Sequence, residues 1–141
     1  MSYIANVVVL LFVLLGLLHV YWAAGGRYGI KKAVPQLDGK PVMEPGALIT
    51  LLVALALWGL AYLVYVLNHH ELNNMRYGQY IIYVGWLASA VFIMRAIGDF
   101  KFVGFFKKVK SSEFAMYDTK YYSPLCLGLG CAIAALAFHQ T

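Results

Sequence analysis

Four apolar segments dominate the chain, and short polar segments separate them. Each of the first three extends for about 20 residues, the length that an α-helix needs to cross the ~30 Å hydrocarbon layer of a bilayer. The fourth is shorter, so a membrane-spanning helix there needs residues before Pro124 or after Phe138. The pattern predicts an all-α fold, an integral membrane four-helix bundle in which residues 1–141 form one domain. The expected helices cover residues 3–24, 46–68, 77–98 and 123–139.

Residues at the segment boundaries fit helix ends. Pro45 suits the first turn of the second helix, where its missing N–H has no intrahelical partner to lose. Ser123 precedes Pro124 and is the expected N-cap of the fourth helix. The pair Gly25-Gly26 is a suitable C-terminal stop for the first helix.

The composition agrees with a membrane protein. Hydrophobic residues make up 62% of the chain and charged residues 12%, against roughly 25% charged residues in a soluble domain. The net charge is +5, but the basic residues lie in loops beside apolar segments, so anionic lipid headgroups are the expected partners and nucleic acid is not. Cys126 and Cys131 lie inside an apolar segment and are interpreted as helix-packing residues, and no metal site is expected.

The loops differ strongly in charge. Nine of the eleven Lys and Arg residues lie in the first and third loops, whereas the second loop holds Arg76 alone and Arg95 lies inside a span. The positive-inside rule then places the first and third loops in the cytoplasm and both termini outside. The nine residues are Arg27, Lys31, Lys32, Lys40, Lys101, Lys107, Lys108, Lys110 and Lys120.

The third loop carries a helical period between Lys101 and Lys110. Phe102, Phe105, Phe106 and Val109 recur at i, i+3, i+4 and i+7, and lysines occupy the remaining arc. This pattern predicts an amphipathic helix that lies half-buried at the cytoplasmic interface. Binding of a specific lipid or of a partner protein by this helix is the alternative.

Three polar residues inside or near the spans need an explanation. Arg95 is the only charge well within a span, where an unpaired charge costs several kcal/mol. Asp99 follows at i+4, so the two are expected to pair. The pair is interpreted either as a structural lock or as a binding pair for an anionic or dipolar ligand. His19 lies at a similar depth in the first helix, either as a hydrogen-bonded buried histidine or as a ligand or proton-transfer group.

These residues and their aromatic neighbours form a candidate site at the cytoplasmic end of the bundle. The expected ligand is a lipid, a quinone or another small amphipathic molecule, and neither a cofactor nor a reaction can be assigned because no known catalytic motif is present. The alternative is a structural or accessory protein in which the cluster only locks the helices together. Transport is a third interpretation and would require a homo-oligomer. The candidate residues are His19, Tyr21, Trp22, Glu44, Arg95, Asp99, Phe100 and Tyr122.

Several of these residues fall in longer motifs that resemble a bacterial family of small four-helix membrane proteins of unknown function. The resemblance extends almost from end to end. It implies a location in the bacterial inner membrane and a four-helix architecture, and it implies no activity. The motifs are HVYWAAGG at 19–26, AVP at 33–35, RAIGDF at 95–100, VGFFK at 103–107 and YSPLC at 122–126.

Overall fold

The structure is a computed structural model that describes residues 2–42, 44–98 and 102–141. Within these residues, four helices are long and apolar enough to cross a membrane, which confirms the all-α membrane fold. Each helix end lies within one residue of its expected position. The long helices are α1 (Ser2–Ala23), α3 (Ala47–His69), α4 (Gly78–Ile97) and α6 (Ser123–Gln140).

The fourth span is longer than α6 alone. The short helix α5 (Glu113–Tyr117) runs through a π-helical turn, η2 (Asp118–Tyr122), directly into α6, and together they form a 28-residue span. The expected N-cap at Ser123 is therefore wrong, because Ser123 already has helical backbone angles. The cap is Ser112, whose hydroxyl accepts a hydrogen bond of 3.1 Å from the N–H of Ala115.

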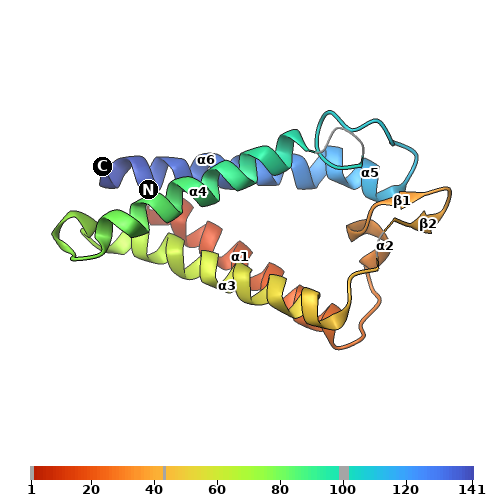
Figure 1. The fold of residues 1–141 in the computed structure, drawn as a ribbon, viewed down its shortest axis with the longest axis horizontal. Coiled ribbons are helices and arrows are strands. Elements are labelled where there is room, and N and C mark those ends of the chain that lie inside the picture. Colours follow the sequence, from red (N-terminus) through yellow and green to blue (C-terminus); the bar gives the residue numbers. More distant parts are fainter. Residues whose placement is uncertain (1, 43, 99–101) are drawn as a thin grey trace.

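The long helices pack as two pairs, α1 with α3 and α4 with α6 (Figure 1). The pairs meet near the two chain termini and the short helix η1 (Leu72–Asn74), which we call the narrow end. They diverge towards the opposite end, where α2 (Ile30–Ala33), the hairpin of β1 (Gln36–Leu37) and β2 (Lys40–Pro41), and α5 lie. We call this the wide end. The topology therefore brings the first and third loops together at one end of the molecule.

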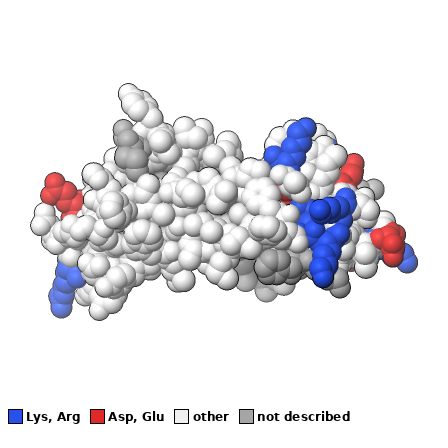
Figure 2. Space-filling view, turned by 90° about the horizontal axis from the view of Figure 1, so that it is seen from above, with Lys and Arg blue, Asp and Glu red and all other residues white. Residues whose placement is uncertain are grey.

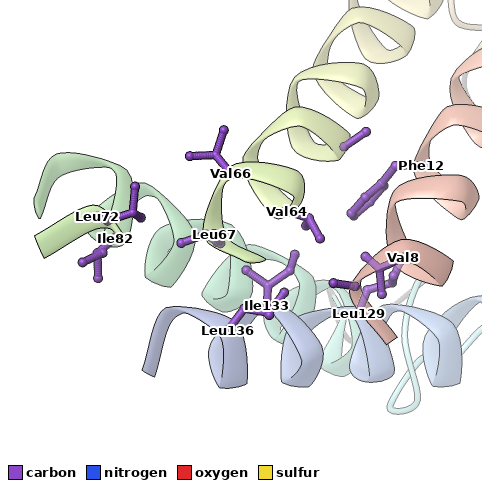
Figure 3. Close-up of a cluster of buried hydrophobic side chains, with 12 residues drawn as sticks. Val8, Phe12, Val64, Val66, Leu67, Leu72, Ile82, Leu129, Ile133 and Leu136 are labelled. Carbon is purple, nitrogen blue, oxygen red and sulfur yellow. The ribbon is translucent and has the colours of Figure 1, made fainter. Parts of the chain in front are cut away.

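The hydrophobic core lies at the narrow end (Figure 3). Phe12 of α1 is fully buried, and its ring centroid lies 5.6 Å from that of Phe92 on α4, so this contact joins the two pairs. Gln140 at the end of α6 adds a polar clamp, because its side-chain amide donates to the carbonyls of Leu67 and His70 at 2.8 Å each. The buried members of the core are Ala5, Val8, Phe12, Ala61, Val64, Val66, Leu67, Leu72, Ile82, Leu129, Ile133 and Leu136.

Within each pair, a small residue allows the helices to approach closely. On α6, a Cβ atom at Gly130 would lie 2.8 Å from Cγ1 of Ile93, and the carbonyl of Gly130 accepts a 2.7 Å hydrogen bond from the hydroxyl of Ser89. On α1, Gly16 leaves room for Trp58 of α3, whose indole N–H donates to the carbonyl of Val13 at 3.3 Å. Small residues and interhelical hydrogen bonds are the usual means of helix association in a bilayer, where lipid tails remove the hydrophobic driving force.

The outer faces of the bundle are apolar. Leu48, Leu87 and Met94 are each about two-thirds exposed or more, at 71%, 66% and 67%. Figure 2 shows an uncharged middle region, with Lys and Arg side chains gathered at the wide end. An exposed apolar surface of this extent is incompatible with water and is the surface that a bilayer covers.

The loop between α4 and α5 differs from the expected amphipathic helix. Residues 102–110 form bends and turns, so the helical interpretation of the third loop is wrong. The predicted exposure of the lysines and burial of the phenylalanines is also wrong, because Lys107 is buried whereas Phe106 is 63% exposed. Lys107 turns inward because it forms a buried ion pair with Asp118. The spacing of the phenylalanines therefore does not determine the conformation of this loop.

The two-stranded hairpin was not predicted from the sequence. Its turn contains Asp38 and Gly39, both with positive φ angles of 52° and 77°. An Asp-Gly pair in this conformation is a common hairpin turn. It folds the first loop back over the wide end of the molecule.

The close approach of α4 and α6 leads to the first testable prediction. Gly130→Ala should lower the free energy of unfolding in detergent by about 1–3 kcal/mol, because the new methyl group overpacks against Ile93 and the backbone of Ser89. The matched control is Gly128→Ala on the same helix, where a Cβ atom meets nothing within 4 Å. The control should be neutral or stabilising by up to ~1 kcal/mol. Equal effects at the two positions would contradict the proposed packing.

Candidate functional site

A cavity of ≈ 460 Å³ lies at the wide end between the two helix pairs. Its walls come from α1, from residues 28–34, from the first turns of α3, from the end of α4 and from the junction of α5 and α6. Most of the wall is aliphatic or aromatic. The polar side chains that face the cavity are His19, Tyr28, Lys32, Thr50, Arg95 and Tyr122.

His19 contributes an oriented imidazole. Its Nδ1 lies 2.7 Å from the carbonyl oxygen of Leu15, one turn earlier in α1, and its ring meets that of Trp22 edge-on at 5.0 Å. Because a carbonyl can only accept, Nδ1 must carry the proton, which leaves Nε2 as the acceptor in the neutral imidazole. His19 is thus held by its own helix and presents one fixed face to the cavity.

Trp22 and Tyr21 shape the turn that closes the cavity at the end of α1. The indole N–H of Trp22 donates to the carbonyl of Tyr28 at 2.9 Å, and the N–H of Tyr28 donates to the hydroxyl of Tyr21 at 3.4 Å. A Cβ atom at Gly26 would collide with the ring of Tyr21, so a side chain at this position would require that ring to move. These contacts fold residues 28–34 back over α1, and this places Lys32 at the cavity.

Lys32 reaches the cavity from α2. Its Nζ lies 5.1 Å from the centre of the Tyr117 ring, and hydrogen bonding to Tyr117 raises the pKa of Lys32 above its ordinary value of 10.5. The raised pKa means that Lys32 remains an ammonium ion at neutral pH. The cavity therefore has a permanent positive charge on its α2 wall.

Arg95 supplies a second positive charge from the end of α4. Its Nη2 donates to Oδ1 of Asp118 at 2.9 Å, and its side chain is 31% exposed. Its Nη1 is buried, and among the described residues no group accepts a hydrogen bond from it. A buried donor without an acceptor is costly, so the free edge of the guanidinium has unused binding capacity.

Asp118 is the centre of a buried polar group, which we call the Asp118 cluster: Arg95, Gly104, Lys107, Asp118, Thr119 and Ser123. The carboxylate is fully buried, and its Oδ2 accepts from Nζ of Lys107 at 3.0 Å and from the N–H of Gly104 at 2.7 Å. Its Oδ1 accepts from Ser123 at 3.2 Å in addition to Arg95. Nζ of Lys107 also donates to the carbonyl of Gly104 and to the hydroxyl of Thr119. The described residues of the cluster thus contain two cations and one anion.

Two glycines allow the third loop to reach this cluster. Gly98 and Gly104 both have positive φ, at 91° and 89°, and a Cβ atom on either would collide with the backbone of the other segment. Their contact is held by the N–H of Phe105, which donates to the carbonyl of Ala96 at 2.9 Å. The glycines of the RAIGDF and VGFFK motifs are therefore explained by the approach of the loop to the end of α4.

The structure brings together four of the eight predicted site residues: His19, Trp22, Arg95 and Tyr122 all line the cavity. Tyr21 lies beside it and supports the closing turn. Glu44 lines a second cavity of ≈ 770 Å³, which shares Tyr28 and Lys32 with the first. Asp99 and Phe100 lie outside the described residues.

The sequence did not identify Asp118 as the partner of Arg95. The expected pairing of Arg95 with Asp99 falls outside the described residues and stays a prediction. The sequence did contain one indication of this role. Asp118 is an acidic residue only five positions before Ser123, which begins an apolar helix. Lys107, Lys32 and Tyr28 were also missed as members of the site. Among the described residues, no group of three His, Cys, Asp or Glu side chains is placed to hold a metal ion.

The Asp118 cluster generates a second prediction. Asp118→Ala should lower the free energy of unfolding by about 3–5 kcal/mol, because it leaves the buried Lys107 without a counter-charge. The double variant Lys107→Met/Asp118→Leu should cost less than Asp118→Ala alone, since the unpaired lysine is removed. Chemical unfolding in detergent micelles measures both. The control is Lys108→Met, an exposed neighbour that should change stability by no more than about 0.5 kcal/mol. A double variant that costs as much as Asp118→Ala, or more, would contradict a coupled buried pair.

Comparison with known proteins places the chain in a family. A family model described as "Protein of unknown function (DUF3995)" matches residues 12–133, a range that contains almost the whole cavity wall and the entire Asp118 cluster. Neither the search of curated proteins nor the search of solved structures found a match. The expected membership of a membrane family without known activity is confirmed: the chain is a multi-pass membrane protein of the DUF3995 family.

Proposed function

We propose that this protein binds a small amphipathic or lipid-like ligand in the wide-end cavity, from the cytoplasmic side of the bacterial inner membrane. The observation that carries the proposal is that Arg95, whose side chain is 31% exposed and whose Nη1 has no acceptor among the described residues, lines an otherwise largely apolar cavity. An arginine that served only the bundle would be expected to have its donors satisfied within it.

The make-up of the cavity supports this proposal. Its volume of ≈ 460 Å³ lies within the ~300–1,000 Å³ range of small-molecule sites. Apolar walls with a few convergent polar groups are typical of such sites, because apolar contact gives affinity and polar groups fix orientation. The wall combines Leu15, Leu18 and Val53 with the polar ends of His19 and Arg95. A molecule with one polar and one apolar part matches this arrangement.

The proposed orientation rests on charge. The two loops that carry nine of the eleven basic residues meet at the wide end, and the second loop and both termini lie at the narrow end (Figures 1 and 2). The positive-inside rule assigns the wide end to the cytoplasm and the termini to the outer side. Anionic lipid headgroups, and not nucleic acid, are then the proposed partners of the basic loops.

A structural role is the second candidate function. The observation that favours it is the Asp118 cluster, in which a buried carboxylate accepts four hydrogen bonds from three segments of the chain. Such a cluster locks α4, the third loop and η2 together whether or not a ligand binds. The two functions differ at the cavity, since a lock requires no occupant there.

Ligand binding is tested by native mass spectrometry of gently solubilised protein, which should reveal a retained small molecule. Val53→Trp fills the cavity from α3 and should reduce the retained species at least severalfold. Leu52→Trp is the matched control, because Leu52 is adjacent, 55% exposed and not part of the cavity wall. Equal retention in both variants, or no retained molecule in the unmodified protein, would contradict the proposal.

Orientation is tested by reporter fusions after Thr141. An alkaline phosphatase fusion should be active and a green fluorescent protein fusion dark, because the C-terminus is proposed to lie outside the cytoplasm. A fusion in the loop around Asp38, at the opposite end, should give the reverse pattern. A fluorescent C-terminal fusion would overturn the proposed topology.

A further inference from the structure

We propose that the ligand of the wide-end cavity is an anionic amphiphile, whose carboxylate or phosphate oxygens interact with the guanidinium of Arg95 and with the ammonium of Lys32. This inference rests on the proposed function and specifies the chemistry of its ligand. Three features carry it: the guanidinium of Arg95 at the cavity, the balance of charge around Asp118, and a second cation that lines the same cavity from α2.

The geometry of Arg95 favours an anion over a neutral acceptor. The guanidinium is planar and presents its donors as a fixed fork that matches two oxygens of a carboxylate or phosphate. Asp118 binds Nη2, and the Arg95 side chain is 31% exposed and lines the cavity. Hydrogen bonds in which a partner is charged are roughly twice as strong as neutral ones. An anionic ligand in the cavity would therefore add a second charged partner to the guanidinium.

The charges near the cavity also favour an anion. Within the described part of the Asp118 cluster, the single negative charge of Asp118 is shared by Arg95 and Lys107. Lys107 is buried with Asp118 and is absent from the cavity wall, so its charge is matched inside the cluster. The remaining positive charge belongs to Arg95, the one member of this ion-pair set that lines the cavity.

Lys32 adds the second cation from a different part of the chain. It lines the same cavity from α2, and the pKa of its ammonium lies above the ordinary value. Glu113 is close enough to interact electrostatically with Lys32, but it borders the second cavity and not the first. The first cavity is thus lined by two cations and by no described acidic residue.

The rest of the wall explains why the ligand also has an apolar part. Leu15, Leu18, Ile49 and Val53 extend the cavity along α1 and α3, away from the two cations. A free inorganic anion would leave this surface without a contact, whereas an acyl chain would cover it and remove it from water. Fatty acids and lipids with a terminal phosphate share the required chemistry of a negative head on an acyl chain.

The experiment compares four probes by native mass spectrometry and by thermal unfolding of the solubilised full chain. Palmitate and palmitoyl lysophosphatidic acid carry the two anionic heads. Monopalmitoylglycerol is an uncharged amphiphile with the same chain, and inorganic phosphate is an anion without a chain. We expect both anionic amphiphiles to bind at least about tenfold more tightly than either of the other two, because charge-assisted hydrogen bonds and the apolar wall must act together.

Variants separate the two cations from general attraction to a basic surface. Lys32→Gln removes a cation that is outside the Asp118 cluster, and it should weaken binding of the anionic probes about tenfold without affecting monopalmitoylglycerol. Lys120→Gln is the control, since Lys120 lies at the same end, rests on the ring of Tyr121 and is absent from both cavities. Arg95→Lys keeps a positive charge for Asp118 but loses the fork, and should weaken the anionic probes as well.

Each contrary result has a definite meaning. If monopalmitoylglycerol binds as tightly as palmitate, the anionic ligand is overturned and the amphipathic site of the proposed function stands. If inorganic phosphate alone binds as tightly as lysophosphatidic acid, the site takes a free anion and the amphiphile is overturned. Equal losses in Lys32→Gln and Lys120→Gln would overturn the two-cation site. If no amphiphile binds and the purified protein retains none, the proposed function fails together with this inference.

Discussion

The carboxylate of Asp118 is the interaction on which the wide end depends. It joins the end of α4 through Arg95, the third loop through Lys107 and Gly104, and the first turn of α6 through Ser123. A charge this deeply buried is tolerated only where it is paired and hydrogen-bonded, and each of these partners meets that requirement. The same carboxylate orients Arg95, because it binds Nη2 of the guanidinium while the side chain of Arg95 lines the cavity.

Different kinds of interaction hold the chain together at the two ends of the bundle. At the narrow end, interdigitated apolar side chains, the contact of Phe12 with Phe92 and the hydrogen bonds of Gln140 bring the helix pairs together. At the wide end, the pairs are separated by a cavity, and the connection is electrostatic and local to α4, α6 and the third loop. Stability is therefore concentrated at one end and the candidate chemistry at the other, which is a common division in proteins that bind ligands.

The sequence predicted the helices well because hydrophobic length and periodicity are set by the bilayer itself. It also led to the expectation that His19, Trp22, Arg95 and Tyr122 lie close together, and all four line the same cavity, because residue counts from helix ends translate directly into distance. It did not predict contacts made by turns. The partner of Arg95 depends on how the third loop folds, and the positive φ angles of Gly98 and Gly104 send Lys107 inward against its helical pattern. The positions of Tyr28 and Lys32 at the cavity depend in the same way on a turn, which Trp22 and Tyr21 stabilise.

The arrangement of two helix pairs joined at one end has a mechanical consequence. Beyond a fulcrum at the core around Phe12, α1 continues to Ala23, so each pair extends as a stiff lever of roughly 17 Å at ~1.5 Å per residue. A rotation of a few degrees about such a fulcrum displaces the nearby side chains by a fraction of an ångström but the far tips by several times as much. The separation of the two helix pairs at the wide end should therefore change more easily than their separation at the core. Lateral pressure from the bilayer at the level of α2 and α5 would therefore bring the two pairs closer together. The same pressure at the level of the termini would be resisted by close-packed side chains.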